Sequence, residues 1–158
     1  MNKSAAAKYV SILWATPEHA EAFAELHAPL FPQAWDAASF RELLGHPGAT
    51  SFLARAGDPP EIVGFIVGRL VADEAEMLSL GVHKEWQRLG IGRQLVQALA
   101  RAAKKADVHR LYLEVSVTNA PALVLYKRLG FQEAGRRKGY YERAGAAPDD
   151  AINLSLAL

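Results

Sequence analysis

The sequence predicts one α+β domain, residues 1–158, in which a mixed central β-sheet carries helices on both faces. The length of 158 residues suits a single hydrophobic core. Short stretches rich in Val and Ile are typical of strands, whereas other segments place apolar residues at helical spacing. These segments follow one another in the order β α α β β β α β α β β. That order differs from the regular strand–helix alternation of a doubly wound fold.

Turn and cap residues delimit the elements of the first half of the chain. Thr16 followed by Pro17 is typical of a helix start, and Asp36 can cap a second short helix. The turn signal Gly57-Asp58-Pro59-Pro60 separates two strands. The expected elements are a strand at 11–14, helices after Thr16 and Asp36, and strands at 50–55, 62–71 and 75–82.

The second half continues with two helices between strands. Ile91, Leu95 and Leu99 share one face of a helix expected over 90–105. Pro121 suits the first turn of a shorter helix that Asn119 caps. The remaining expected elements are a strand at 110–117, the helix at 119–129, a strand that starts at 130–131, and a last strand at 152–158.

Composition excludes several classes of function. The chain has 18 basic and 17 acidic residues, so its net charge of +1 gives no electrostatic case for binding nucleic acid or an anionic membrane. It has no cysteine, which excludes disulfides, thiolate metal sites and a cysteine nucleophile. We expect a cytoplasmic protein, because neither a secretory signal nor a membrane-spanning run is evident. We also expect no metal, because no histidine pair has ligand spacing on a helix. The histidines are His19, His27, His46, His83 and His109.

The segment from Leu80 to Arg93 combines a strand end, a basic turn with two glycines and a helix start. The first N–H groups of a helix lack internal acceptors, and glycines let a phosphate approach the backbone. Arg88 and Arg93 add cationic donors. The segment is not a P-loop, and Leu95 stands where the dinucleotide fingerprint needs a third glycine. Glycine count alone favours an ordinary strand-to-helix turn over a phosphate site.

Two motifs together resemble the GCN5-related N-acetyltransferase (GNAT) superfamily. Gln87-Arg-Leu-Gly-Ile-Gly92 matches its Gln/Arg-x-x-Gly-x-Gly/Ala signature, and Asn119 to Phe131 matches its Asn-x-x-Ala-x-x-x-Tyr-x-x-x-Gly-Phe helix. The resemblance covers nearly the whole chain. It implies a single N-acetyltransferase domain of the GNAT fold, with acetyl-CoA as acyl donor. The residues that it implies for acetyl-CoA binding are Leu80, Gly81, Val82, Arg88, Leu89, Gly90, Ile91, Gly92, Arg93 and Asn119.

A closer resemblance is to the RimI family, the ribosomal-protein-alanine N-acetyltransferases. The matching segments are Asp73-Glu74-Ala75, Leu113-Glu114-Val115, Arg136-Arg137-x-x-Tyr140-Tyr141, Asp149-Asp150-Ala151 and Phe31-Pro32-Gln33-Ala34-Trp35. This likeness implies that the acceptor is the N-terminal alanine of a small-subunit ribosomal protein. The chain departs from the family in separating Pro32 from Trp35 by two residues, and in having Gly81 where a small apolar residue is common.

An N-terminal amine needs little help to lose its proton, because its pKa is about 7.7–8.0 against about 10.4 for lysine. Glu114 is the candidate base: strand alternation sets it opposite Leu113 and Val115, and the resemblance implies the role. Tyr126 is the candidate acid, because a phenol can protonate a thiolate. The alternatives are a solvated strand carboxylate and a core aromatic. The resemblance also implies a bulge in the strand that contains Leu80 to Val82, where a main-chain N–H polarises the thioester.

The acceptor cleft is expected to involve Trp35, Glu74, Tyr140 and Tyr141, which could equally be rim packing. We expect direct transfer in a ternary complex, because no cysteine can carry the acetyl group. The expected partners are acetyl-CoA and the N-terminal peptide of a ribosomal protein, and the sequence leaves monomer or dimer open. One alternative acceptor is a small amine, an antibiotic or a lysine side chain. Another alternative is a non-catalytic acyl-CoA-binding module.

Overall fold

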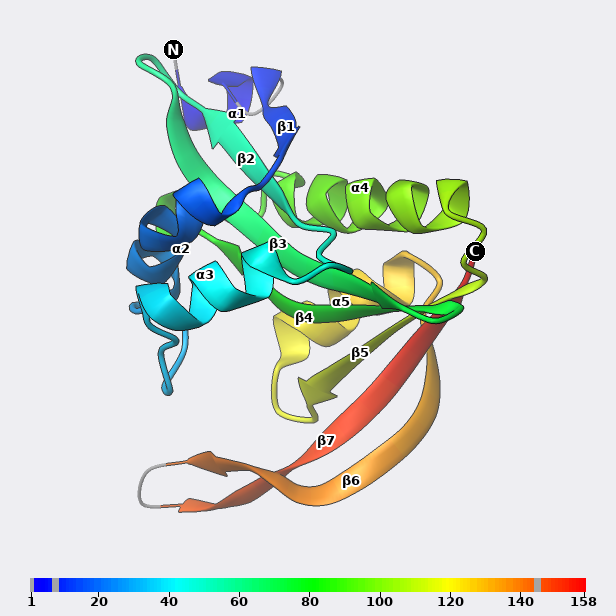
Figure 1. Cartoon of the computed structure of the whole chain (residues 1–158). Helices are drawn as coiled ribbons and strands as arrows, with labels where there is room; N and C mark the ends of the chain where they lie inside the picture. The colour runs from blue at the N-terminus through cyan, green and yellow to red at the C-terminus, as the bar shows by residue number, and fades with distance from the viewer. Residues whose placement is uncertain (1, 7–8, 144–145) are drawn as a thin grey trace.

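The computed structural model describes the backbone of residues 2–6, 9–143 and 146–158, and their side chains apart from Ser4 and residues 136–149. Its centre is a seven-stranded sheet of order β1-β2-β3-β4-β5-β7-β6 (Figure 1). All paired neighbours are antiparallel except β4 and β5, which are parallel. The predicted mixed sheet is therefore confirmed. The strands are β1 Ser11–Trp14, β2 Phe52–Ala56, β3 Glu61–Val71, β4 Glu74–Val82, β5 Arg110–Ser116, β6 Gln132–Arg143 and β7 Ala146–Ala157.

Helices cover both faces of the sheet, as expected (Figure 1). Two of them begin at the predicted caps: Asp36 Oδ1 accepts from the Ser39 N–H at 2.8 Å, and Asn119 Oδ1 accepts from the Ala122 N–H at 3.3 Å. Pro17 opens a single 3-10 turn that leads into the first long helix. The helices are α1 Lys3–Ala6, η2 Pro17–His19, α2 Ala20–His27, α3 Ala37–Gly45, η3 Lys84–Trp86, α4 Ile91–Lys105 and α5 Ala120–Arg128.

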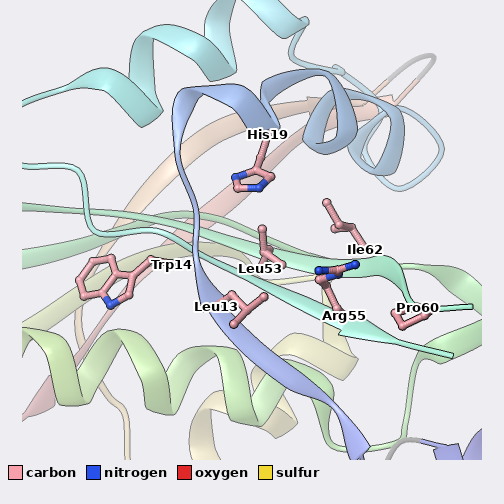
Figure 2. A pocket seen from close by; sticks show the side chains of 7 residues that line it. All are labelled: Leu13, Trp14, His19, Leu53, Arg55, Pro60 and Ile62. Carbon is pink, nitrogen blue, oxygen red and sulfur yellow. The ribbon is translucent and has the colours of Figure 1, made fainter.

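The β1 end of the sheet is an edge with exposed apolar side chains. Leu13 and Trp14 project from β1, and the Trp14 ring lies 4.4 Å from that of Phe52. A shallow depression beside this edge is drawn in Figure 2. Its lining residues are Leu13, Trp14, His19, Leu53, Arg55, Pro60 and Ile62. The lining therefore extends from β1 across β2 to Ile62 of β3, and it includes no residue of β4 or β5.

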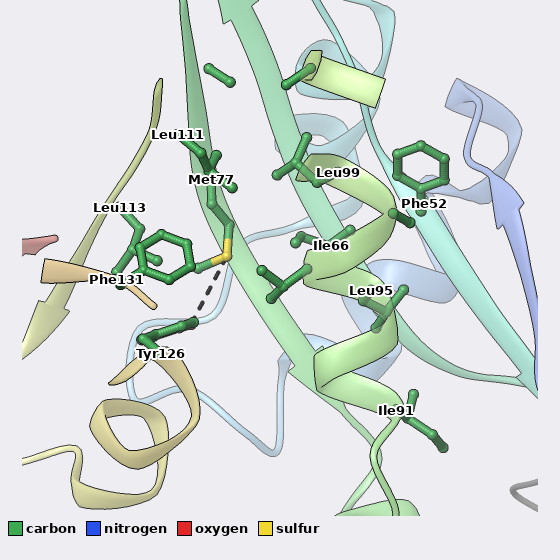
Figure 3. Close-up of a cluster of buried hydrophobic side chains, with 14 of the residues drawn as sticks. Phe52, Ile66, Met77, Ile91, Leu95, Leu99, Leu111, Leu113, Tyr126 and Phe131 are labelled. Carbon is green, nitrogen blue, oxygen red and sulfur yellow. Dashed lines mark hydrogen bonds between the residues drawn. The ribbon is translucent and has the colours of Figure 1, made fainter. Parts of the chain in front are cut away.

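The hydrophobic core is split by the sheet into two clusters. The larger cluster packs α4 and α5 against one face, with Ile91, Leu95 and Leu99 fully buried along α4 (Figure 3). The smaller cluster packs α2 and α3 against the opposite face. It is strongly aromatic: the Phe65 ring from β3 lies 5.0 Å from Phe23 and 5.7 Å from Phe40.

Strands β6 and β7 form a longer hairpin than the sequence predicts (Figure 1). Pairing runs from Gln132 opposite Ser155 to Arg143 opposite Ala146, with three register shifts. The additional residues of the hairpin pair through their backbones. Their side chains are largely polar, so the sequence has no apolar run there that would predict strands. None of the helices in the described part of the chain is long and apolar enough to cross a bilayer.

The sheet opens between β4 and β5. Their parallel pairing is limited to Glu74–Met77 opposite Arg110–Leu113. Beyond that, within the described parts of the chain, β4 is paired to β3 alone up to Val82, and β5 is paired to β7 alone up to Ser116. The strands therefore separate after Met77 and Leu113, and we call this point the apex of the opening.

A β-bulge begins the open part of β4. Val67 pairs with Ser79 but Gly68 pairs with Met77, so Leu78 is the extra residue. The expected bulge is thus present in this strand, two residues before Leu80. The bulge shifts the alternation of side chains along β4 by one residue. Met77 packs with the α4 cluster, Leu78 packs with the α2 cluster, and Leu80, three residues after Met77, packs with the α4 cluster again.

Candidate active site

Glu114 lies directly after the apex on β5. It follows Leu113, the last β5 residue that pairs with β4, and its cross-strand neighbour on β7 is Asn153. Leu113 and Val115 are buried in the α4 cluster, so alternation sets the half-buried Glu114 on the opposite face. The carboxylate is therefore on the side of the sheet that α2 and α3 cover.

Tyr126 reaches the same apex from the other face. It is 4% exposed on α5, and its hydroxyl donates to the sulfur of Met77 at 4.0 Å (Figure 3). Its ring meets Phe131 edge-on at 5.5 Å. Because Met77 is the last residue of β4 that pairs with β5, the hydroxyl of Tyr126 lies at the apex of the opening. The two candidate catalytic residues therefore lie next to the apex on opposite faces of the sheet, Glu114 on the α2 and α3 face and Tyr126 on the α4 and α5 face.

The turn before α4, residues 87–92, has the backbone form of an anion site; we call it the glycine turn. Gly90 is the N-cap of α4 with φ 86°, and no side chain caps the helix there. Arg88 also has a positive φ, 64°. The first intrahelical bond is that of the Gln94 N–H to the Gly90 carbonyl at 3.1 Å. The N–H groups of residues 91–93 therefore have no partner within the helix, and the helix dipole adds positive potential there.

The glycine turn is hydrogen-bonded to the open end of β4. The Gln87 side-chain amide donates to the Val82 carbonyl at 3.0 Å. A Cβ placed on Gly92 would lie 3.5 Å from Leu125 of α5, 3.9 Å from Val82 and 4.0 Å from Leu80. The start of α4, the end of β4 and α5 therefore meet here. This brings most of the residues predicted for acetyl-CoA binding into one place.

Two further predicted cofactor residues occupy distinct positions. Gly81 lies on the α2 face of β4, where a Cβ would come within 2.6 Å of the Phe65 ring and 3.3 Å of Leu30. Asn119 is exposed at the start of α5, where its side chain already caps the helix. Between the apex and Val82, no strand of the described residues lies beside the edge of β4 that faces away from β3. Such an edge can pair with the amide groups of an extended ligand.

The residues predicted for the acceptor cleft are less closely grouped. Trp35 is half-buried, and its ring stacks on His27 at 5.2 Å and lies 5.5 Å from Phe40. Glu74 is exposed at the closed end of β4, opposite Arg110 and three residues before Met77. At the usual strand rise this is about 10 Å from the apex. The structure does not bring Glu74 to the opening. The side chains of Tyr140 and Tyr141 lie outside the described residues.

Sequence reasoning missed His27. The residue is 2% exposed at the end of α2, and its ring stacks on Phe31 at 4.1 Å as well as on Trp35. Its Nδ1 accepts the Trp35 N–H at 3.1 Å. Burial lowers the pKa of His27 from its ordinary value of 6.5. Aromatic residues at 23, 31, 35 and 40 surround it in the sequence, but no local spacing indicates that they meet around an imidazole.

The described residues contain no group of three or more His, Asp or Glu side chains arranged to hold a metal ion. The chemistry available at the apex is that of the Glu114 carboxylate, the Tyr126 phenol and the backbone groups of the open part of β4. A carboxylate can accept a proton from an amine, and a phenol can supply one to a leaving thiolate. Backbone N–H groups of β4 can stabilise negative charge that develops on a carbonyl oxygen.

Comparison with known proteins identifies the family. The family model described as "Acetyltransferase (GNAT) family" matches residues 20–131. The [ribosomal protein bS18]-alanine N-acetyltransferase of Escherichia coli K12 is 34% identical over 134 residues, 85% of this chain and 86% of that protein. The N-alpha-acetyltransferase RimI of Mycobacterium tuberculosis is 37% identical over 137 residues, 83% of this chain and 84% of that protein.

The fold agrees with this assignment. The crystal structure of the ribosomal-protein-S18-alanine N-acetyltransferase from Escherichia coli superposes with a TM-score of 0.85 and 28% identity, over 94% of this chain and 93% of that one. The resemblance inferred from the two sequence motifs is confirmed. The chain belongs to the GNAT acetyltransferase family and is an N-acetyltransferase related to the RimI enzymes.

Proposed function

We propose that this enzyme transfers the acetyl group of acetyl-CoA to the N-terminal α-amine of a protein, and that its acceptor is the N-terminal alanine of a small-subunit ribosomal protein. The observation that carries the proposal is the opening of β4 from β5, with Glu114 and Tyr126 at its apex. The substrate rests on likeness to relatives named as [ribosomal protein bS18]-alanine N-acetyltransferase and as N-alpha-acetyltransferase.

The glycine turn and the open edge of β4 suit acetyl-CoA. The donor set of the turn consists of first-turn N–H groups, and glycine at the N-cap leaves them uncovered. Arg88 and Arg93 would add positive charge for the pyrophosphate. Residues 78–82 would pair with the amide-bearing arm, which directs the thioester towards the apex.

At the apex, Glu114 would take a proton from the acceptor amine, directly or through one water. The amine nitrogen then bonds to the acetyl carbon as the carbon–sulfur bond breaks. A backbone N–H of the open part of β4 would stabilise the carbonyl oxygen. Tyr126 would give its proton to the departing sulfur. Each proton and electron pair is accounted for without a covalent enzyme intermediate, so transfer is direct in a ternary complex.

A second acceptor class remains a distinct candidate because of the loop between α2 and α3. Two residues separate Pro32 from Trp35, more than in the RimI pattern, and Trp35 is packed within the aromatic cluster. A differently shaped loop could admit a small amine, an antibiotic or a lysine side chain at the same apex. The two candidates share the donor site and differ only in what the acceptor side binds.

Intact-mass analysis of an acceptor panel tests the proposal. The panel holds peptides that start with Ala, Ser or Met, an N-blocked peptide with one lysine, and spermidine, each with acetyl-CoA and the enzyme. We expect one acetyl group on the Ala-starting peptide and none on the N-blocked peptide. Transfer to lysine or spermidine instead would establish the second candidate. Absence of transfer to any N-terminal amine, with acetyl-CoA binding confirmed by calorimetry, would overturn the proposal.

A further inference from the structure

His27 organises the connection between α2 and α3, residues 28–36, which we call the α2–α3 loop. The carbonyl of His27 accepts the N–H groups of Leu30 at 3.0 Å and Phe31 at 3.2 Å. Its imidazole Nδ1 accepts the N–H of Trp35 at 3.1 Å. One residue thus anchors the loop near its start through its backbone and near its end through its side chain.

The imidazole is also packed between the aromatic side chains of the loop. Its ring is stacked on Phe31 at 4.1 Å with an interplanar angle of 13°, and on Trp35 at 5.2 Å with an angle of 20°. Phe40 of α3 meets it edge-on at 5.3 Å, and Phe65 of β3 lies 6.2 Å away. Because Nδ1 accepts a backbone N–H, a neutral ring carries its proton on Nε2.

The α2–α3 loop lies against the open part of β4. Leu30 is so close to Gly81 that a Cβ there would come within 3.3 Å of its Cδ1. Gly81 is in the stretch of β4 beyond the apex, where β4 no longer pairs with β5. The loop is therefore on the α2 face of the opening, and this is the face on which Glu114 lies. An acceptor amine that approaches Glu114 from this face passes the loop.

We propose that His27 is a positioning residue for the acceptor, in that its imidazole holds the α2–α3 loop in the form that binds the acceptor beside the open end of β4. The inference rests on the proposed function, because it assigns the loop to the acceptor side of that site. His27 does not touch the reacting atoms. Its effect is on acceptor binding, not on acetyl-CoA binding or on the chemical step.

The hydrogen bond to Trp35 makes this role dependent on pH. Protonation of Nδ1 removes the acceptor for the Trp35 N–H, so the loop loses its second anchor. The aromatic rings that face the imidazole from α3, β3 and the loop are Phe40, Phe65, Phe31 and Trp35, all of them uncharged, and burial is the cause of the lowered pKa of His27. Burial among them lowers the pKa of His27, so the loop keeps its anchor at neutral pH and loses it in acid.

The test replaces His27 by phenylalanine, which keeps the ring stack and removes the acceptor atom. His19→Phe is the matched control, because His19 Nδ1 accepts the Thr16 N–H at 3.0 Å, outside the α2–α3 loop. With the acceptor that the wild type acetylates, we expect His27→Phe to raise the acceptor KM about fivefold, the effect of one lost hydrogen bond. The KM for acetyl-CoA and kcat should not change, and His19→Phe should leave all three unaltered.

A pH series separates positioning from a structural role. The ratio of the acceptor kcat/KM in wild type to that in His27→Phe cancels every pH dependence that the two enzymes share. We expect this ratio to be constant above the pKa of His27 and to fall towards one below it. A ratio that is independent of pH, or an equal change in both KM values, would overturn the proposal.

Amide hydrogen exchange at Trp35 tests the anchor without relying on turnover. We expect exchange about tenfold faster in His27→Phe than in wild type, in line with about 1.4 kcal/mol of lost protection. His27→Asn offers an oxygen near the position of Nδ1 and should restore part of the protection. Unchanged exchange at Trp35 would overturn the positioning role even if the enzyme acetylates the Ala-starting peptide. A wild type that acetylates no N-terminal amine would overturn the proposed function and, with it, the role of the loop.

Discussion

The two sides of the opening in the sheet are built by different means. On the donor side, the glycine turn is set by the backbone: Gly90 with φ 86° begins α4 without a side-chain cap. On the acceptor side, the α2–α3 loop is set by side chains, with His27 stacked between Phe31 and Trp35. The donor must always present the same phosphates, which backbone N–H groups bind well. A side-chain-built loop can change with the acceptor while the donor site stays fixed.

The largest effect should come from the apex, which belongs to neither side. We expect Glu114→Gln and Tyr126→Phe each to lower kcat by roughly tenfold or more, because each removes a proton-transfer group. Acetyl-CoA affinity, measured by calorimetry, should stay nearly the same. The matched controls are Glu76→Gln on β4 and Tyr112→Phe on β5, which should keep full turnover. Full activity in the two apex variants would remove Glu114 and Tyr126 from the mechanism.

Next in size is a change confined to the donor side. Gly90→Ala forces a Cβ into the left-handed region, which costs about 1–2 kcal/mol. If the turn relaxes to relieve this strain, its N–H groups no longer converge, and the KM for acetyl-CoA should rise by up to about tenfold. The acceptor KM should not change.

Gly45→Ala is the control for that variant. Gly45 ends α3 without a positive φ, and its Cβ would meet only Pro17 at an ordinary 3.7 Å. It should behave as wild type in both KM values. Equal increases in both KM values for Gly90→Ala would contradict the division of the site into a backbone-built donor side and a side-chain-built acceptor side.

A smaller effect should follow where the two sides touch. A Cβ in Gly81→Ala would lie 2.6 Å from Phe65 and 3.3 Å from Leu30, so the aromatic cluster and the α2–α3 loop must shift. Overpacking of this kind costs about 1–3 kcal/mol, measurable by chemical denaturation. We expect the acceptor KM to rise a few-fold, about threefold, and more than the KM for acetyl-CoA.

The double variant Gly81→Ala with Phe65→Leu tests the cause. The smaller side chain at 65 gives the new methyl group room, so the acceptor KM should return towards its wild-type value. If the acceptor KM of the double variant does not return towards the wild-type value, the increase caused by Gly81→Ala comes from a change at the edge of β4 and not from displacement of the α2–α3 loop.

Features of the site that depend on neighbouring residues were predictable from the sequence. Asp36 and Asn119 cap their helices as expected, because a cap is decided within three residues. The glycine turn before α4 follows in the same way from a short motif. The strand carrying Glu114 was also predictable, because Leu113 and Val115 alternate with it.

Features that depend on distant residues were not predictable. The bulge at Leu78 is a mismatch between β3 and β4, and the sequence of β4 alone does not locate it. The length of the β6–β7 hairpin comes from backbone pairing with no apolar pattern. His27 gains its role only when β3 and α3 bring Phe65 and Phe40 to it. The acceptor side was therefore less predictable than the donor side, as expected for a region built by tertiary packing.

The smallest predicted effect concerns stability and follows from the burial of His27. In the unfolded chain its pKa is near 6.5, and in the folded protein burial holds its pKa lower. Between these two values the unfolded state binds a proton that the folded state does not. The free energy of unfolding should therefore fall as pH is lowered through this window, by at most about 1.4 kcal/mol per pH unit.

Above pH 6.5 neither state binds that proton, so His27 contributes no pH dependence there. Urea unfolding at a series of pH values measures how the free energy of unfolding depends on pH. Within the window, His27→Phe should remove the contribution of one proton from this dependence. If His27→Phe keeps the full dependence, His27 is already protonated or solvated in the folded protein. Its Nδ1 would then not hold Trp35, and the acceptor side would not be built around a neutral imidazole.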